Sequence, residues 1–292
     1  MTFKEYVCPE SLEEAWELNQ KKNNRIVAGN MWLRLGKGSC NKLIDLSGLN
    51  LDKIEDLGPE IKIGAMVSLR ELEENNLLNG LTGDIFKNSL KYIVGTQFRN
   101  AATVGGSVYS RFGFSDAGNL LMAVDAEVEL YKAGRMGLAD FYASSRNEDS
   151  LTAVYVKKKP VNIRYFVKRN TATGLPLLNV SVASDEIGIR VCVGARPGRA
   201  KCICFDGITA DRLQLAGECD REATAGEKSS ESEAGKECAG ERETITEQIV
   251  KTCMDSLCFG SNSYASAAYR KQLAKVFIRR GLGELSGAGI NT

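Results

Sequence analysis

Two short glycine-containing segments carry the residue types that could bind an anion. The first, IVAGNMWL (26–33), leads a strand-like run into a glycine, and the second, TVGGS (103–107), places two glycines beside a threonine hydroxyl. Because glycine has no Cβ, a ligand can approach the main chain closely, and successive N–H groups can point at a phosphate. Asp116 follows the second segment and adds an acceptor. These residues predict a site for a phosphate-bearing ligand.

The chemistry that such a site could perform is limited by what the chain lacks. It has no GxGxxG motif, and LRLGKGS (33–39) differs from a P-loop because Gly38 separates Lys37 from Ser39. The sequence contains no histidine, which removes the commonest general base and the usual Ser-His and Cys-His nucleophile arrangements. If the protein is an enzyme, a bound cofactor therefore carries the chemistry.

The composition indicates a soluble protein with more than one domain. The chain has 292 residues, 43% of them hydrophobic, and a formal charge of +1 without a basic segment, which disfavours nucleic-acid binding. No apolar run approaches the roughly 20 residues of a membrane span. The charged N-terminus MTFKEYVCPESLEE has no secretory apolar region. Nine cysteines without an export signal indicate reduced thiols, so we expect a cytoplasmic protein.

Hydrophobic periodicity predicts mixed helices and strands that would position the two segments. We expect helices at 9–22 and 84–94, strands at 24–29, 42–46 and 126–132, and a strand followed by a capped helix within 61–75. From about residue 151, five short runs predict an antiparallel meander, and helices follow at 244–257 and 264–282, the second stopping at Gly281.

Composition divides the chain into two α+β domains. We place the boundary near 158–162, with the first domain at 1–160, in lobes of about 1–55 and 56–160, and the second at 161–292. The segment 216–244 is small, charged and almost without bulky apolar residues, which predicts a mobile loop.

The order of several motifs resembles a known family. IVAGNMWL, IGAMVSLRELE, GTQFRNAATVGGSV and SDAGNLLMAVDAEVEL, followed by LADFY and the terminal AYRKQLAKVFIRRGL, are similar to the FAD-binding medium subunit of the molybdenum hydroxylases, the family of xanthine dehydrogenase and carbon monoxide dehydrogenase. The resemblance covers nearly the whole chain. It implies a two-lobed FAD-binding domain of the vanillyl-alcohol-oxidase (PCMH) type, followed by a small C-terminal domain with an antiparallel sheet and helices.

The resemblance also implies a set of cofactor contacts. The residues that would wrap the FAD pyrophosphate and ribityl chain are Ile26, Val27, Ala28, Gly29, Asn30, Met31, Trp32, Leu33, Thr103, Val104, Gly105, Gly106 and Ser107. Asp116 would accept a hydrogen bond from a cofactor hydroxyl, and Leu151 would pack near the flavin ring. Lys168 would lie beside the polar edge of that ring, where a positive charge stabilises reduced flavin. From the residues alone, Asp116 could instead cap a helix and Lys168 could be a solvated strand end.

Function follows from the same resemblance. It implies an electron-transfer subunit without catalytic residues of its own, which passes electrons from [2Fe–2S] clusters in a small subunit through FAD to NAD⁺ or another acceptor. A separate large subunit would hold the molybdopterin cofactor. Two alternatives remain: a stand-alone FAD oxidoreductase on the same fold, or a flavin-free scaffold subunit. The second is motivated by Arg111-Phe112, which stand where relatives have Ser-Pro.

The cysteines do not form a metal-binding pattern. Seven of them fall in the C-terminal part of the chain, and neither Cys202-x-Cys204 nor the Cys253/Cys258 spacing matches a C-x2-C framework. Alternation along AKCICF places Cys202 and Cys204 on one face of a strand, where they could serve as small hydrophobic residues. We therefore expect no metal site in this chain.

Overall fold

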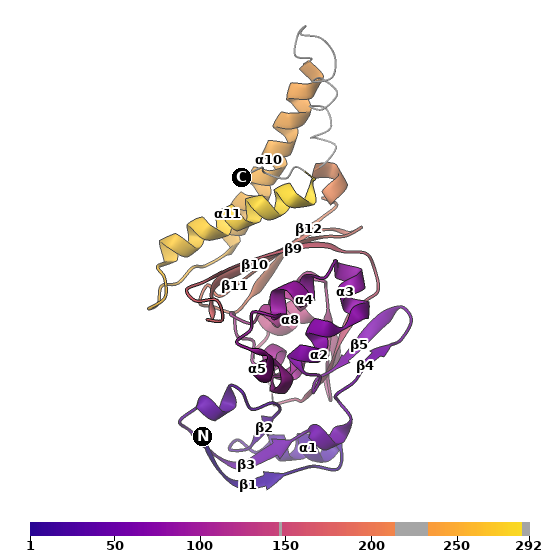
Figure 1. Ribbon diagram of the computed structural model, residues 1–292, viewed down its shortest axis with the longest axis vertical. Coiled ribbons are helices and arrows are strands. Elements are labelled where there is room, and N and C mark those ends of the chain that lie inside the picture. The colour runs from indigo at the N-terminus through magenta and orange to yellow at the C-terminus, as the bar shows by residue number, and fades with distance from the viewer. Residues whose placement is uncertain (146–147, 214–232, 288–292) are drawn as a thin grey trace.

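Three β-sheets follow one another along the long axis of the molecule, with the N-terminus in the first and two long helices beyond the third (Figure 1). The structure is a computed structural model and describes residues 1–145, 148–213 and 233–287.

The first lobe contains a three-stranded parallel sheet of order β1-β3-β2. Its elements are β1 (Thr2–Val7), α1 (Leu12–Asn19), β2 (Arg25–Val27), the short 3-10 helix η1 (Leu33–Leu35), β3 (Ser39–Asp45) and a second 3-10 helix η2 (Ser47–Leu49). A capping serine begins α1, since the Ser11 hydroxyl accepts a hydrogen bond from the Glu14 N–H at 3.2 Å. Ala15 of α1 packs on Ile44 and Leu46, which forms a small separate core.

The second lobe is built on a five-stranded antiparallel sheet of order β4-β5-β8-β6-β7. Its strands are β4 (Ile54–Asp56), β5 (Glu60–Gly64), β6 (Glu127–Leu130), β7 (Gly134–Gly137) and β8 (Leu151–Lys157). Its helices are α2 (Leu69–Glu74), α3 (Asn76–Thr82), α4 (Ile85–Leu90), α5 (Thr96–Ala101), α6 (Val104–Tyr109), α7 (Asp116–Ala123) and α8 (Leu138–Ala143). The run at 151–157 therefore lies in the middle of this sheet and not in the C-terminal meander where its sequence placed it.

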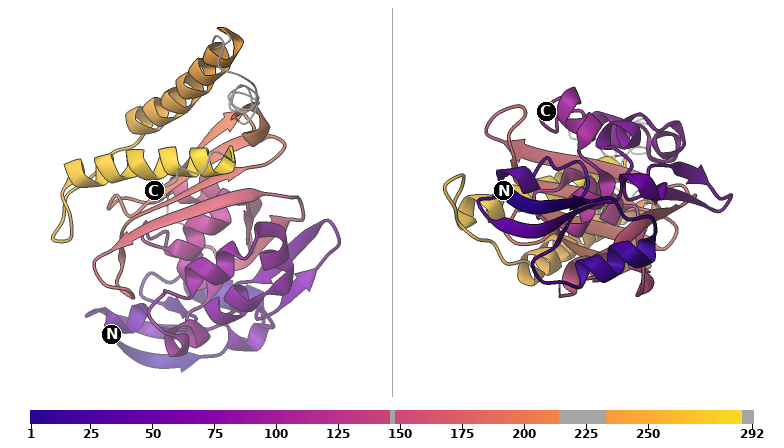
Figure 2. Two further views of the ribbon diagram at one scale, coloured as in Figure 1. Left: turned by 45° about the horizontal axis from the view of Figure 1, so that its top comes forward. Right: turned by 90° about the horizontal axis from the view of Figure 1, so that it is seen from below.

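The third sheet is the predicted antiparallel meander, reduced to four strands of order β12-β11-β10-β9. These are β9 (Asn162–Arg169), β10 (Pro176–Ser184), β11 (Gly188–Gly194) and β12 (Lys201–Asp206). Helix α11 (Ala267–Leu285) crosses one face of the sheet, and α10 (Glu233–Ser256) packs beside it and projects beyond the sheet (Figures 1 and 2). The other face contacts α7 of the second lobe, so the sheet is buried on both sides.

Two predictions about the C-terminal half need correction. The part of the predicted mobile loop at 216–232 lies outside the described residues, but from Glu233 onward the chain is helical. That stretch is rich in Glu, Lys and Ala, which favour helices even without apolar residues. Gly281 does not end its helix either: it lies inside α11, where an added Cβ would meet Val182 Cγ2 at 2.5 Å. The glycine allows α11 to approach β10 closely.

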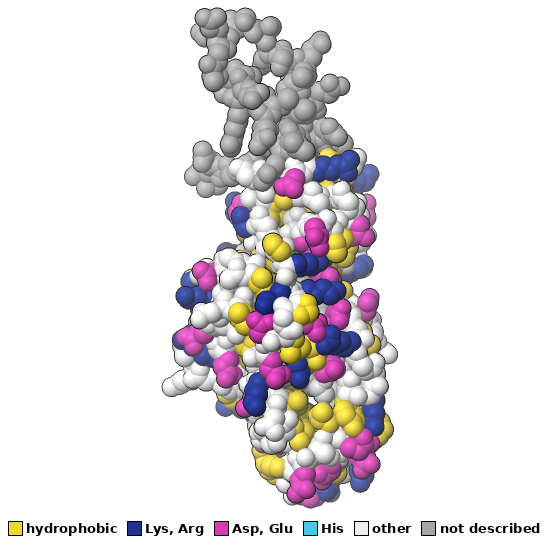
Figure 3. Space-filling view, turned by 90° about the vertical axis from the view of Figure 1, so that its right-hand side faces the viewer, with side chains coloured by type: hydrophobic (Ala, Val, Ile, Leu, Met, Phe, Trp, Pro, Cys, Tyr) yellow, Lys and Arg dark blue, Asp and Glu magenta, His cyan; other side chains and the backbone are white. Residues whose placement is uncertain are grey.

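Positive and negative side chains are interspersed on the face shown in Figure 3, with a few hydrophobic side chains between them over the first lobe. Among the described residues, no helix is both long enough and apolar enough to cross a bilayer.

Candidate functional site

The two glycine segments are neighbours in the structure. The backbone of Gly29 lies directly against the peptide that joins Ala101 and Ala102, and a Cβ built on Gly29 would stand only 1.5 Å from the Ala101 carbonyl oxygen. The first segment therefore rests on the chain just before Thr103. Gly29, which the sequence singled out for a ligand, is therefore required by close packing between these two segments.

The first segment presents open main-chain donors. Within the described part of the chain, the N–H groups of Gly29, Asn30, Met31 and Trp32 donate to no other residue. Asn30 has a left-handed backbone with φ 54°, and Trp32 returns to the right-handed region with φ −103° and ψ −43°. Main-chain N–H groups without a protein acceptor can donate to an anion that approaches this turn. This segment fits a phosphate group.

The second segment is built differently from the expectation. Its N–H groups are occupied: Gly105 donates to the Ala65 carbonyl at 2.8 Å, and Gly106 donates to the Thr103 hydroxyl at 3.1 Å. Val104 and Ser107 donate to the carbonyls of Val67 and Thr103. Thr103 is thus the cap of α6, and Gly105 is needed because an added Cβ would lie 2.7 Å from Ala65 O. The paired glycines do not offer free amides to a ligand in this structure.

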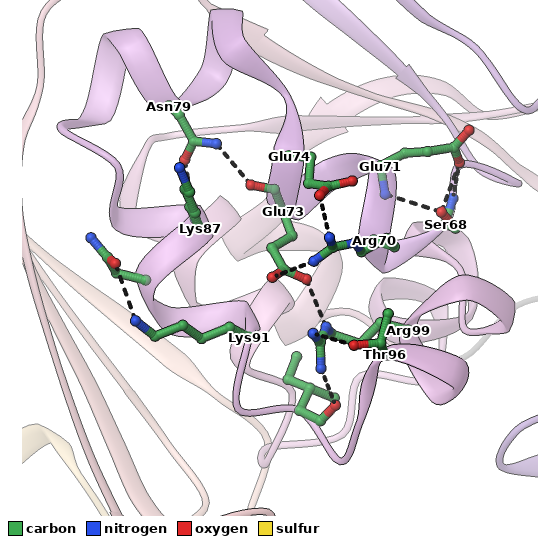
Figure 4. A network of polar contacts seen from close by, with 12 residues as sticks. Ser68, Arg70, Glu71, Glu73, Glu74, Asn79, Lys87, Lys91, Thr96 and Arg99 are labelled. Carbon is green, nitrogen blue, oxygen red and sulfur yellow. Dashed lines mark hydrogen bonds and ion pairs between the residues drawn. The ribbon is translucent and has the colours of Figure 1, made fainter.

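A buried ion pair fixes the chain that leads into Thr103. The Arg99 Nε donates to Glu73 Oε2 at 2.6 Å, both side chains are 5% exposed, and Arg70 binds the other oxygen of Glu73 at 3.0 Å (Figure 4). Arg99 also donates to the Ile93 carbonyl at 3.2 Å. Because Arg99 lies in α5, these bonds hold the helix that ends at Ala101, against which Gly29 packs.

Asp116 is buried and engaged by the C-terminal sheet. It occupies the first position of α7, whereas the cap is Ser115, whose hydroxyl accepts from the Gly118 N–H at 3.1 Å. The Asp116 carboxylate forms an ion pair with Arg169 at 2.5 Å and accepts a hydrogen bond from the Tyr165 hydroxyl. Its exposure is 4%. The reading of Asp116 as a helix cap is therefore wrong, and its oxygens already have protein partners.

The other two predicted contacts lie in different surroundings. Leu151 begins β8 and is buried in the core of the second lobe. Lys168 is exposed on β9, between Val167 and Arg169. Successive strand residues face opposite sides of a sheet. Arg169 faces Asp116, while Phe166 stacks on Phe277 of α11, so alternation places Lys168 on the side away from Asp116.

A polar network that sequence reasoning missed connects α7 to the third sheet. The Asn119 amide donates to Asn179 Oδ1 and to the Cys192 carbonyl, both at 3.3 Å, and Ser181 donates its hydroxyl to Asn119. Burial, followed by the adjacent Asp116 carboxylate, raises the pKa of Tyr165 well above its usual value. The sequence signal for this network was the pair of polar residues Asn179 and Ser181 inside the largely apolar run LLNVSVAS.

Trp32 of the first segment packs in an aromatic cluster with two phenylalanines of the 111–114 turn. The ring of Trp32 lies 5.3 Å from Phe112 and 5.0 Å from Phe114, and the two phenylalanines stack at 4.9 Å. Trp32 remains 44% exposed, so one part of the cluster faces solvent. The Gly113 carbonyl accepts from the Ala195 N–H at 2.6 Å, which fixes the 111–114 turn on the third sheet. A separate surface hollow lined by residues including Thr2 and Asn41 contains none of the predicted contacts.

Comparison with known families identifies the family of this chain. Residues 1–156 match the model of the FAD binding domain in molybdopterin dehydrogenase. The chain belongs to this family. FAD is its cofactor, and the protein is an oxidoreductase component of the molybdopterin dehydrogenase type, as its sequence motifs predicted.

Solved structures with the same fold extend over the whole chain. A chain of the Cu,Mo-CO dehydrogenase in its cyanide-inactivated form aligns with a TM-score of 0.75 and 18% identity, over 99% of each chain. Quinoline 2-oxidoreductase from Pseudomonas putida 86 aligns with a TM-score of 0.72 and 18% identity, over 99% of this chain and 98% of the other. Among curated proteins, the uncharacterized protein YgfM of Escherichia coli K12 is 24% identical over 218 residues, 73% of this chain and 78% of YgfM.

FAD carries a pyrophosphate and planar rings, and the site has residues that suit both parts. The open amides of 29–32 suit the pyrophosphate, and the exposed part of Trp32 suits a planar ring. The amides of 104–107 and the carboxylate of Asp116 are engaged by protein groups. The fit is therefore good at the first segment, while the second segment acts as its support.

Proposed function

We propose that this chain is the electron-transfer subunit of a cytoplasmic molybdenum hydroxylase complex. A partner large subunit would hold the molybdopterin cofactor, and a small subunit would deliver electrons through [2Fe–2S] clusters. The observation that supports this most strongly is the whole-length similarity to single chains of two multi-component oxidoreductases.

Within this proposal, the first segment holds the cofactor. The N–H groups of residues 29–32 bind the pyrophosphate, and Trp32 covers a ring of the same molecule. When bound, FAD supplies reversible two-electron chemistry and connects one-electron clusters to an acceptor. The protein orients it by the contact of Gly29 with Ala101, and the Glu73–Arg99 ion pair keeps that contact in place.

A pair of glycine variants tests the role of the first segment. In Gly29→Ala, the new Cβ would lie 1.5 Å from the Ala101 oxygen, so the segment must move away and its amides lose their alignment. Gly38→Ala is the matched control, because a Cβ there meets nothing within 4 Å. A hydrogen bond to a charged group contributes about 1.5–3 kcal/mol, so losing two weakens FAD binding about 10²- to 10⁴-fold. Equal FAD affinity in both variants, measured by equilibrium titration, would place the pyrophosphate elsewhere.

The assignment of partners and acceptor needs the complex itself. We expect the affinity-tagged chain, purified from its natural host, to bring down two further subunits together with molybdenum and iron in metal analysis. Anaerobic NADH should bleach the flavin absorbance of the FAD-loaded chain if NAD⁺ is the acceptor, and another acceptor is indicated if only dithionite does so. A chain that elutes alone and oxidises an organic substrate would favour the stand-alone oxidoreductase. A colourless chain that refuses added FAD would favour the scaffold.

A further inference from the structure

Three cysteines of the third sheet lie together on the face that meets the second lobe. Cys192 of β11 is directly opposite Cys202 of β12, and Cys204 is two residues further along the same strand. Cys192 is buried within the core of the second lobe, and Cys202 packs partly against that core, whereas the intervening Ile203 packs with α10 and α11. Strand alternation therefore brings all three thiols to one side of the sheet.

The strand register indicates that Cys192 and Cys202 form the type of opposite pair in which the two Cα atoms are closer together. The Gly207 N–H donates to the Ile187 carbonyl at 2.9 Å, which makes that opposite pair a hydrogen-bonded one. Hydrogen-bonded and non-hydrogen-bonded pairs alternate along an antiparallel ladder. Five steps further, Cys192 and Cys202 form a non-hydrogen-bonded pair, for which the Cα atoms are about 4.5 Å apart. Disulfides span Cα separations of about 4.4–6.8 Å, so this pair needs no backbone movement to be bridged.

The thiols also form a graded path from solvent to core. Cys204 is exposed on the edge strand β12, Cys202 is half-buried, and Cys192 is fully buried. Cys202 lies opposite Cys192 on the neighbouring strand and two residues from Cys204 on its own strand. Cys202 and Cys204, two residues apart on one strand, are separated by about 6.6–6.8 Å between Cα atoms, at the upper limit for a disulfide. The cross-strand pair is thus the favoured end point.

We propose that Cys192, Cys202 and Cys204 form a disulfide-exchange site that accepts a low-molecular-weight disulfide at Cys204 and ends as a Cys192–Cys202 disulfide. Cys204 attacks the small disulfide, releases one small thiol and retains the other half as a mixed disulfide. Cys202 then attacks the Cys204 sulfur and displaces the second small thiol. Cys192 attacks Cys202 and returns Cys204 to the thiol form. Two protein thiols are oxidised and one small disulfide is reduced to two thiols.

The local charges set the rate of the first step. The thiolate is the attacking species. Contact with Cys202, together with burial, raises the pKa of the Cys204 thiol, while Arg190, which pairs with Cys204 across the ladder, lowers it in part. The exchange is therefore slow at neutral pH and accelerates as the pH rises, as long as the sheet stays folded.

Peptide mapping after treatment with oxidised glutathione tests the site in the full chain. Trypsin releases Cys192 in VCVGARPGR (191–199), because the Arg196–Pro197 bond resists cleavage, and releases Cys202 and Cys204 together in CICFDGITADR (202–212). We expect these peptides to become linked, with fragmentation assigning the link to Cys202. In Cys204→Ser, linking should slow about tenfold or more, since the exposed acceptor is lost.

Two further variants make the result decisive. Cys192→Ala should stop the sequence at a Cys202–Cys204 bridge or a glutathione adduct on Cys204, with no linked peptides. Cys258→Ser is the matched control, because Cys258 is exposed and is not one of the three proposed cysteines. In this variant the two peptides should become linked as in the wild type. The proposal fails if wild-type protein carries adducts on Cys8 and Cys258 but no linked peptides, or if Cys204→Ser links them at the wild-type rate.

Discussion

Replacing Asp116 by asparagine distinguishes a structural carboxylate from a cofactor contact. In Asp116→Asn the Arg169 guanidinium, 8% exposed, stays buried without its ionic partner. Removing one member of a buried ion pair costs about 3–5 kcal/mol, because the remaining charge cannot be resolvated. We therefore expect the free energy of unfolding in urea to fall by about that amount. Asp116 also accepts from Tyr165, so the upper part of this range is expected.

An exposed ion pair supplies the control. Glu247 and Arg279 are 50% and 44% exposed and join the two C-terminal helices at 2.7 Å, so Glu247→Gln should cost less than about 1 kcal/mol. The double variant Asp116→Leu with Arg169→Met should recover part of the loss, since it removes both charges. If Asp116→Asn destabilises no more than Glu247→Gln but weakens FAD binding, Asp116 serves the cofactor and the structural interpretation is refuted.

Three further predictions concern packing, pH and the cofactor. Gly281→Ala should destabilise by about 1–3 kcal/mol through overpacking against β10, whereas Gly80→Ala, in an exposed turn of α3 with nothing within 4 Å, should be neutral or stabilising, as measured by urea unfolding. Burial favours the neutral form of Asp185, but hydrogen bonds from Arg190 and Lys159 outweigh it and hold the pKa of this carboxyl below its usual value. Its ionised form therefore stabilises the fold above about pH 4, and the stability gap between wild type and Asp185→Asn should close as the pH falls below that value, in urea titrations at several pH values. Binding of FAD should quench the fluorescence of Trp32 more than that of Trp16, so Trp32→Phe should remove most of the quenching and Trp16→Phe should retain it.

Local signals in the sequence predicted local structure well. The cap of α2, the strand-to-glycine transition at 26–29 and the alternation of the C-terminal strands all depend on neighbours within a few residues. The family was also evident from ordered motifs. The assignment of the run at 151–157 to the C-terminal meander was wrong. A strand that is buried on both faces has the same continuous apolar pattern in any sheet, so its periodicity does not indicate its partner strands.

The candidate site was harder to predict, for a physical reason. The sequence analysis assigned Gly105 to ligand binding, whereas the structure shows that Ala65 packs against it. Both requirements exclude a Cβ, so the sequence alone cannot distinguish them. The partners of Asp116 come from residues that are far away in sequence, and no local pattern contains them. Conversely, the open amides of 29–32 depend on the left-handed turn at Asn30, which the sequence indicated only through its glycine neighbour.

The polar network around α7 has a consequence for how this family can be divided or recombined. The family match stops at residue 156, yet Asp116 and Asn119 bind residues of β9 and β10, beyond that limit. A fragment cut at 156 would therefore carry a carboxylate and an amide with no partners inside it. The second lobe and the third sheet should melt as one calorimetric unit. Transplanting the C-terminal part between relatives should succeed only when the matching face of α7 travels with it.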